Sequence, residues 1–174
     1  MAVKNVLIAQ IVDNLRRVFQ AIHIHSRRAK KQAGLTGPQL WAIRIVADSA
    51  PIKVSELSKK MYLHPATVVG ILDRLEMNGL VRRTRSRADR RVVHVELTRA
   101  GLNLVEKSPK VVQGLLIPGL ESLPLEKLSG VSESLEVLVG LVGAGELQPK
   151  LLLSSEVNLP RNTRNTGLRE RKKQ

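Results

Sequence analysis

The chain contains no cysteine among its 174 residues. Disulfide bonds, thiolate catalysis, cysteine redox sensing and cysteine-ligated zinc are therefore excluded. His23 and His25 are two positions apart, so on a helix they point to different sides, and neither His64 nor His94 accompanies carboxylates in a metal-site pattern. No activated nucleophile or pair of acids is visible either. We therefore expect a protein that is not an enzyme and that holds neither a metal ion nor a cofactor.

Long hydrophobic runs are also missing. The apolar start of the chain is interrupted by Gln10, Asp13 and Asn14 before it reaches the length of a signal sequence or a membrane span. We therefore expect a cytoplasmic protein with no membrane partner. A hydrophobic content of 43% over this length supports one folded domain with a real core, which we place at residues 1–158.

Acidic residues are scarce, with 15 Asp and Glu against 29 Lys and Arg, which gives a formal charge of +14. Such a charge favours nucleic acid or another anionic surface as a partner and says nothing about the fold. Two segments concentrate it. The first, 80–97, holds six arginines, and the second, 159–174, holds six basic residues against Glu170 with almost no apolar side chain. We expect 159–174 to be a basic tail that is disordered when free.

Aromatic residues make up only 2% of the chain, so Trp41, the single tryptophan, is expected to anchor the core. Apolar residues recur at helical spacing in several segments. Thr36 or Gly37 is expected to cap the second helix, and Ser55 to cap the third. Pro109 is expected to divide the helical stretch after residue 98, and Pro118-Gly119 to break the helical structure that follows it. The helices are expected at about 6–33, 38–50, 54–61, 65–78 and 124–142.

A short helix, a three-residue turn, a second helix and a basic β-hairpin follow one another between residues 54 and 97. This is the layout of a winged helix-turn-helix, so we expect a mainly α fold with a small β-hairpin wing. In the helix at 65–78, one side is expected to be buried: Val68, Ile71, Leu72 and Leu75. The other side displays Ala66, Val69, Gly70, Asp73, Arg74 and Met77, with Thr67 at its margin.

Small residues near the start of this helix provide clearance for entry into a DNA major groove, which is about 12 Å wide. Thr67 can bond to a phosphate or a base edge, and Arg74 can reach a guanine edge or a phosphate. In the hairpin, each arginine presents a planar fork that suits phosphate. Neighbouring like charges on paired strands repel unless something neutralises them. Double-stranded DNA is therefore the leading candidate partner.

These residues resemble the MarR (multiple antibiotic resistance regulator) family of bacterial transcription regulators. The similarity is carried by 55–58, by the helix and turn at 66–81, and by Asp89-Arg90-Arg91 followed by Leu97-Thr98-Arg99-Ala100-Gly101. The last spacing is similar to the family's wing signature and is the more specific part. The resemblance is close over about 35–101 and extends to the flanking helices only in pattern.

The resemblance implies a homodimer that reads a pseudo-palindromic operator, with a winged-helix lobe at about 35–101 and interlocking dimerisation helices at about 4–33 and 122–147. It places Arg91 or Arg90 in the minor groove, where narrow A-tract geometry attracts arginine, with Asp89 pairing with a neighbouring arginine to orient the wing. A repressor released by a small organic effector is expected. The candidate DNA-binding residues are Pro65, Ala66, Thr67, Val69, Gly70, Arg74, Arg85, Arg87, Asp89, Arg90 and Arg91.

Two positions depart from the family's pattern. His64 stands where the family often has serine. Histidine is expected to be a poor cap for the helix at 65–78, which is the recognition helix, and the lack of a good cap typically costs ~1 kcal/mol of stability. Val69 and Gly70 stand where polar residues are frequent, which argues against base readout through hydrogen bonds at these two positions.

The apolar stripes of the first and last helices exceed what one small lobe can cover, which favours a dimer. The alternative is that both helices fold back on their own lobe. A second function also remains open, a sequence-independent architectural protein that binds nucleic acid through the basic tail. Deletion of 159–174 separates the two, because a regulator would retain operator selectivity without it.

Overall fold

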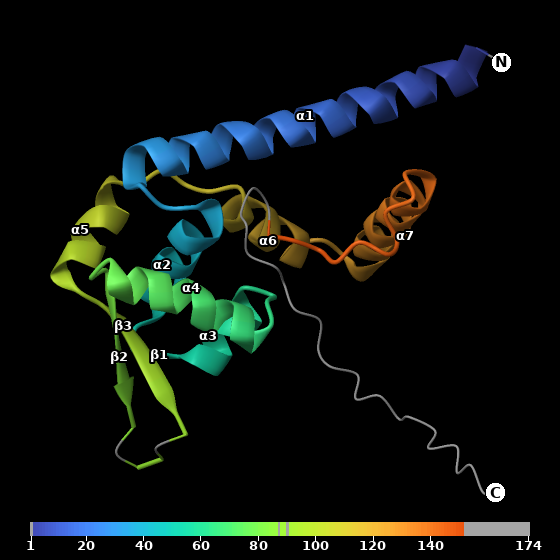
Figure 1. Ribbon diagram of the computed structural model, residues 1–174. Helices are drawn as coiled ribbons and strands as arrows, with labels where there is room; N and C mark the ends of the chain where they lie inside the picture. The colour runs from blue at the N-terminus through green and yellow to red at the C-terminus, as the bar shows by residue number, and fades with distance from the viewer. Residues whose placement is uncertain (1, 87, 90, 152–174) are drawn as a thin grey trace, which may run out of the picture.

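The computed structural model describes residues 2–86, 88–89 and 91–151, and Figure 1 shows a lobe from which two helical arms extend. The lobe contains every described strand. The elements in chain order are α1 (Ala2–Ala33), α2 (Gly37–Ser49), β1 (Ile52–Lys53), α3 (Val54–Lys60), α4 (Pro65–Met77), β2 (Val81–Arg85), β3 (Val93–Leu97), α5 (Arg99–Lys107), α6 (Gln113–Glu121) and α7 (Leu125–Leu141). The expected mainly α fold with a hairpin wing is confirmed.

Helix α2 begins where the sequence places a cap. The hydroxyl of Thr36 accepts a hydrogen bond from the backbone N–H of Gln39, and the Gln39 side chain accepts one from the backbone N–H of Thr36. This reciprocal pair satisfies two donors that a helix start leaves open, and Pro38 in the first turn needs no donor. Helix α2 then runs through the middle of the lobe, in contact with α1, α4, α5 and α6.

The sheet has three antiparallel strands in the order β1-β3-β2. Strand β3 pairs with β2 from Val81↔Leu97 to Arg85↔Val93, which forms the hairpin, and with the two residues of β1 on its other side. The sequence pattern did not predict β1. Because Ile52 and Lys53 pair with β3, α3 begins directly after them with Lys53 as a cap that makes no side-chain bond, so the prediction of Ser55 as the cap was wrong.

The core lies inside the lobe, between α2, α3, α4 and the sheet. Trp41 is 8% exposed, which confirms its expected role as a core anchor. The fully buried side chains come from every element of the helix-turn-helix and from the sheet: Leu40, Ile43, Val46, Ile52, Leu57, Met61, Val68, Ile71, Leu72, Leu75, Val81 and Val95. This packing fixes α4 on the lobe and holds the hairpin beside it.

The two arms have little of their surface covered. Helix α1, at the top of Figure 1, buries only Ala29, and α7, at the right, buries no residue in the described chain. The structure therefore does not show the alternative in which both helices fold back on their own lobe.

The chain between the lobe and α7 is divided as expected near Pro109, where α5 has ended and α6 has not begun. The expected break at Pro118-Gly119 was wrong, because Pro118 lies inside α6. Proline removes one helical hydrogen bond, but the bonds Leu116 N–H to Val112 carbonyl and Ser122 N–H to Pro118 carbonyl continue on both sides. The helix therefore passes through the proline.

Within 2–86, 88–89 and 91–151, no helix combines the length and the apolar content needed to cross a bilayer. The same residues contain no group of three or more His, Asp or Glu side chains placed to hold a metal ion.

Candidate nucleic-acid interface

Helix α4 has two distinct sides. Val68, Ile71, Leu72 and Leu75 are fully buried, which confirms the predicted inner side. The outer side is open, with Ala66, Val69, Asp73, Arg74 and Met77 exposed to solvent. A Cβ atom added at Gly70 would find no other atom within 4 Å, so the outer side is slim at its middle as well. This side has the clearance that insertion into a major groove requires.

Thr67 lies elsewhere than predicted. It is 7% exposed, so its expected place at the margin of the outer side was wrong. The residue is next to Val68, and the buried side of α4 extends this far toward the helix start. The outer side therefore begins with Pro65 and Ala66 and continues at Val69.

The start of α4 is capped by the residue expected to do so poorly. The Nδ1 atom of His64 accepts a hydrogen bond from the backbone N–H of Ala66 at 3.3 Å. An imidazole acceptor can therefore take the place of a serine hydroxyl here. Pro65 follows at the first helical position, where the missing N–H costs nothing.

A charged cluster joins the wing to α4. The Arg83 guanidinium on β2 lies 2.7 Å from Oδ1 of Asp73 and 2.5 Å from Oε2 of Glu76, and both acids are on α4. The backbone N–H of Arg83 also donates to Oε1 of Glu76 at 3.0 Å. Because Glu76 holds both the backbone and the side chain of one strand residue, the cluster fixes the hairpin relative to the recognition helix.

The same cluster changes the ionisation of Glu76. The side-chain hydrogen bond from Arg83 lowers the pKa of the Glu76 carboxyl, while desolvation opposes this shift and the backbone bond supports it. A carboxyl whose pKa is lowered in the folded state stabilises the protein above its unfolded-state pKa. The contribution is lost as the pH falls through the lowered value.

A second arginine of the hairpin is also neutralised. Arg82 lies opposite Glu96 in the β2–β3 register, and its Nη2 atom is 2.8 Å from Oε2 of Glu96. Arg82 and Arg83 therefore meet the requirement that like charges on paired strands be compensated. They belong to the internal structure of the wing.

The tip of the wing is organised by short polar contacts. Oδ1 of Asp89 accepts a hydrogen bond from the backbone N–H of Arg91 at 2.9 Å. The Ser86 hydroxyl accepts bonds from the N–H groups of Ala88 and Asp89, at 3.2 and 3.4 Å. Asp89 thus orders the loop through the backbone of Arg91. The expected pairing of Asp89 with a neighbouring arginine stays a prediction for Arg87 and Arg90, which lie outside the described residues.

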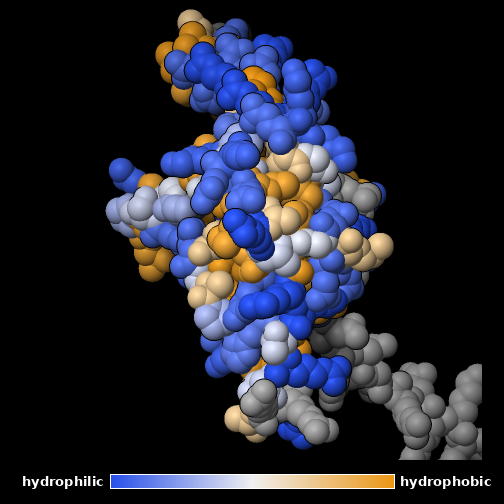
Figure 2. All heavy atoms as spheres, turned by 90° about the vertical axis from the view of Figure 1, so that its left-hand side faces the viewer, coloured by the Kyte–Doolittle hydropathy of each residue, from blue (hydrophilic) through white to orange (hydrophobic). Residues whose placement is uncertain are grey.

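Two arginines of the wing are exposed, Arg85 at the end of β2 and Arg91 in the loop, and no ion pair to either occurs among the described residues. Arg87, Arg90 and the basic tail at 159–174 lie outside the described residues. The described hairpin arginines thus differ in their partners: Arg82 and Arg83 are each paired with an acid, with Arg82 still exposed, while Arg85 and Arg91 are exposed without an ion pair in the described part of the chain. The molecular face in Figure 2 is largely hydrophilic, with hydrophobic atoms reaching the surface near its middle.

A cavity of about 270 Å³ lies between α2 and α6. Its Arg44 donates from Nη2 to the carbonyls of Val105 and Ser108. The Nε atom of Arg44 is buried and has no hydrogen-bond partner within the described chain. The lining residues are Trp41, Arg44, Ile45, Asp48, Lys110, Val111, Gly114 and Pro118.

Sequence reasoning missed the cluster of Asp73, Glu76 and Arg83. A signal was present, because Asp73 and Glu76 are three positions apart and therefore neighbours on one helical face. The partner could not be identified, since six arginines occur in the hairpin and only the packing of β2 against α4 shows that Arg83 meets this helix.

Known proteins that are similar to this chain agree with its helix-turn-helix and wing. Residues 35–93 match the model of the MarR family. The chain is 30% identical over 128 residues to the uncharacterized HTH-type transcriptional regulator YsmB of Bacillus subtilis (strain 168), which covers 74% of this chain and 88% of YsmB. It is 33% identical over 95 residues to the HTH-type transcriptional repressor MdtR of the same organism, which covers 55% of this chain and 61% of MdtR.

Among solved structures, a MepR-like protein crystallised with pseudoligands is similar to this chain with a TM-score of 0.53 and 26% sequence identity, over 78% of this chain and 95% of that protein. The match spans more than the winged-helix lobe. The curated relatives are transcriptional regulators and not enzymes. The described fold has a helix-turn-helix followed by a wing. The chain belongs to the MarR family.

Proposed function

We propose that this protein is a cytoplasmic, homodimeric regulator that binds a pseudo-palindromic DNA operator, represses transcription there and is released by a small organic effector. The observation that carries the proposal is the slim outer side of α4 next to a wing whose Arg85 and Arg91 face solvent. A helix of this shape fits a major groove. Exposed arginines next to it suit phosphates or a narrow minor groove.

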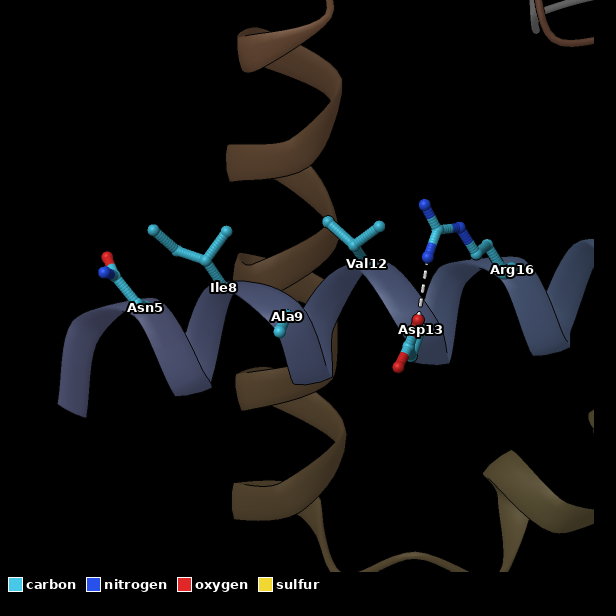
Figure 3. A pocket seen from close by; sticks show the side chains of 6 residues that line it. All are labelled: Asn5, Ile8, Ala9, Val12, Asp13 and Arg16. Carbon is cyan, nitrogen blue, oxygen red and sulfur yellow. Dashed lines mark hydrogen bonds and ion pairs between the residues drawn. The ribbon is translucent and has the colours of Figure 1, made fainter. Parts of the chain in front are cut away.

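The apolar surfaces of the arms support a dimer. Large apolar side chains on α1 and α7 remain about half exposed or more, and Figure 3 shows Ile8 and Val12 on one side of α1. A hollow of about 510 Å³ is lined by α1 residues alone. Exposed apolar surface on this scale is stabilised by a second copy. The residues include Val6, Leu7, Ile8, Ile11, Val18 and Phe19 on α1 and Leu125, Leu135, Val137 and Leu141 on α7.

The cavity between α2 and α6 supports an effector. Its volume suits a small aromatic molecule, and Trp41 offers an apolar wall. Arg44 and Lys110 bring two cations against one acid, Asp48, so an effector with a carboxylate matches the charge of the lining. The cavity also lies where the lobe joins α6, so a bound molecule can shift the lobe relative to the arms. The repressor MdtR among the relatives supports the direction of regulation.

The DNA contact of the wing is tested by Arg91→Ala. The variant is expected to bind a duplex, selected from a random pool with the parent protein, roughly tenfold more weakly, because one exposed cation per subunit, and so two per dimer, is lost near the DNA. The slope of log affinity against log salt should become smaller by about 1.8, the value of two phosphate contacts. Fluorescence anisotropy at several salt concentrations measures both quantities.

Arg17→Ala is the matched control, since Arg17 is an exposed arginine on the α1 arm and does not line the hollow described above. It removes the same charge from the chain and should leave the affinity and the slope almost unchanged. Equal behaviour of the two variants would show that the wing does not contact DNA. A slope near zero for the parent would contradict duplex binding through phosphates altogether.

The effector site is tested with benzoate as a minimal aromatic carboxylate. We expect benzoate at millimolar concentration to change the fluorescence of Trp41, the single tryptophan, and to release the bound duplex. Arg44→Met keeps the bulk of the side chain but removes the charge, so it should weaken both effects at least tenfold. A response to benzoate that is the same in Arg44→Met would place the effector elsewhere.

A further inference from the structure

Tyr62, the single tyrosine of the chain, lies in the turn between α3 and α4. Its backbone has φ of 52°, in the left-handed region that side chains other than glycine rarely adopt. The side chain is 60% exposed, so burial does not explain its position. The residue stands three positions before Pro65, the first residue of the recognition helix.

The phenol reaches across to a helix of the arm. Its hydroxyl donates a hydrogen bond to Oε1 of Glu121 at 2.7 Å, over a sequence separation of 59 residues. This bond raises the pKa of the Tyr62 phenol, because the carboxylate favours the protonated form, and desolvation adds to the shift. Glu121 is the last residue of α6, which leads through 122–124 into α7.

Leu63, the next residue of the same turn, also lies close to residues from later in the chain. Leu63 lines a small hollow together with Gln113, the first residue of α6, and Leu151, which follows α7. Leu63 and Leu151 both pack against the core of the lobe. The turn therefore lies close to both ends of α6, because Tyr62 is hydrogen-bonded to Glu121 and Leu63 shares a hollow with Gln113.

Other contacts between α6 and the lobe are mainly with α2. Gly114 of α6 lies against Trp41, and Gln113 lies against Gly37. These contacts meet α2 near its start, whereas Glu121 at the far end of α6 meets the helix-turn-helix itself. The Tyr62–Glu121 bond is thus placed to control the angle of α6, and with it the direction in which α7 leaves the lobe. Figure 1 shows α6 between the lobe and α7.

We propose that Tyr62 is a positioning residue whose bond to Glu121 couples the arm formed by α6 and α7 to recognition helix α4, and so sets the separation of the two recognition helices in the dimer. The inference rests on the proposed dimeric, DNA-binding function. We expect loss of this bond to change the population of arm orientations several-fold. The lobe itself keeps its core.

The bond can be measured directly, because one tyrosine gives one phenolate signal. An absorbance titration of the parent protein should show the Tyr62 pKa above the ordinary value of about 10. Glu121→Ala should move the pKa down toward that value. An identical titration curve for the parent and Glu121→Ala would overturn the proposal, since the bond would then be absent in solution.

The coupling is tested in the free protein, without DNA. The chain lacks cysteine, so Lys59→Cys on α3 and Lys127→Cys on α7 can carry two spin labels, with labelled protein diluted into unlabelled protein. We expect a narrow distance distribution for the parent and a broader or shifted one for Tyr62→Phe and Glu121→Ala. Glu121→Gln keeps an oxygen acceptor and should retain the narrow distribution. A Tyr62→Phe distribution that superimposes on that of the parent would overturn the coupling.

The consequence for DNA is tested with operators whose half-sites are moved apart or together by one base pair. The parent should discriminate strongly against these spacings, while Tyr62→Phe should reduce that discrimination several-fold and keep an unchanged thermal melt. The same discrimination in both proteins would contradict the positioning role. If the parent binds no duplex, the proposed function fails, whereas the label distances and the phenol titration still decide whether the arm is coupled to the turn.

Discussion

Replacing Ile11 and Leu135 together with aspartate is expected to convert the protein from a dimer into a monomer and to weaken operator binding at least ~100-fold. Both side chains lie on arms that the lobe leaves uncovered, with Ile11 48% and Leu135 54% exposed. An unpaired carboxylate in an apolar interface has a large desolvation cost. A monomer also binds the two half-sites independently, which removes the gain in effective concentration that links them.

Sedimentation equilibrium measures the mass, and anisotropy with a two-half-site duplex measures the affinity. The control places aspartate at Gln20 and Ser132, two exposed polar positions on the same helices, and should remain dimeric. The thermal melt should show a folded lobe in both proteins, because neither pair of residues contributes to the core. A double variant of Ile11 and Leu135 that stays dimeric would show that these faces are not the interface.

Gly101→Ala is expected to lower the free energy of unfolding by on the order of 3 kcal/mol, at the upper end of what overpacking costs. A Cβ atom at this position would lie 2.0 Å from the carbonyl oxygen of Leu80, which is backbone and cannot rotate away. The same carbonyl accepts a hydrogen bond from the N–H of Thr98 at 3.0 Å. The Thr98 hydroxyl donates to the carbonyl of Gly79 and accepts from the N–H of Gly101.

Moving Leu80 away from the new methyl group would therefore disturb the start of the wing and the cap of α5 together. Urea denaturation followed by circular dichroism measures the effect. Gly130→Ala on α7 is the matched control, because nothing lies within 4 Å of a Cβ atom there and the helix gains up to about 1 kcal/mol. A Gly101→Ala variant as stable as the parent would show that this close approach does not exist in solution.

The helix-turn-helix could be predicted from the sequence because its signals are local. Apolar residues at helical spacing identified the buried side of α4, and Thr36 and Pro38 identified the start of α2. These signals involve residues within a few positions of one another, so they can be interpreted without knowledge of the fold. Thr67 was misplaced by the same reasoning, because how far the buried side extends toward the helix start depends on what packs against it.

The location of the candidate interface could be predicted from the sequence, but the different roles of its arginines could not. The excess of arginine in 80–97 identified the wing, yet the sequence treats its six arginines alike. The strand register decides that Arg82 meets Glu96, and the packing of β2 against α4 decides that Arg83 meets Asp73 and Glu76. Arg85 and Arg91 are thereby left as exposed arginines of the wing that have no acidic partner among the described residues.

The sequence by itself determined the class of fold, the arginine-rich hairpin as the expected binding surface, and the family resemblance. Charge, helical period and short motifs are properties of residues that are close together in the chain. Only the tertiary structure decided which charges are compensated, that β1 joins the sheet, that α6 continues through Pro118, and that Tyr62 meets Glu121. Each of these depends on residues brought together from distant parts of the chain by the packing of the core, and their contact free energies appear only once that packing exists.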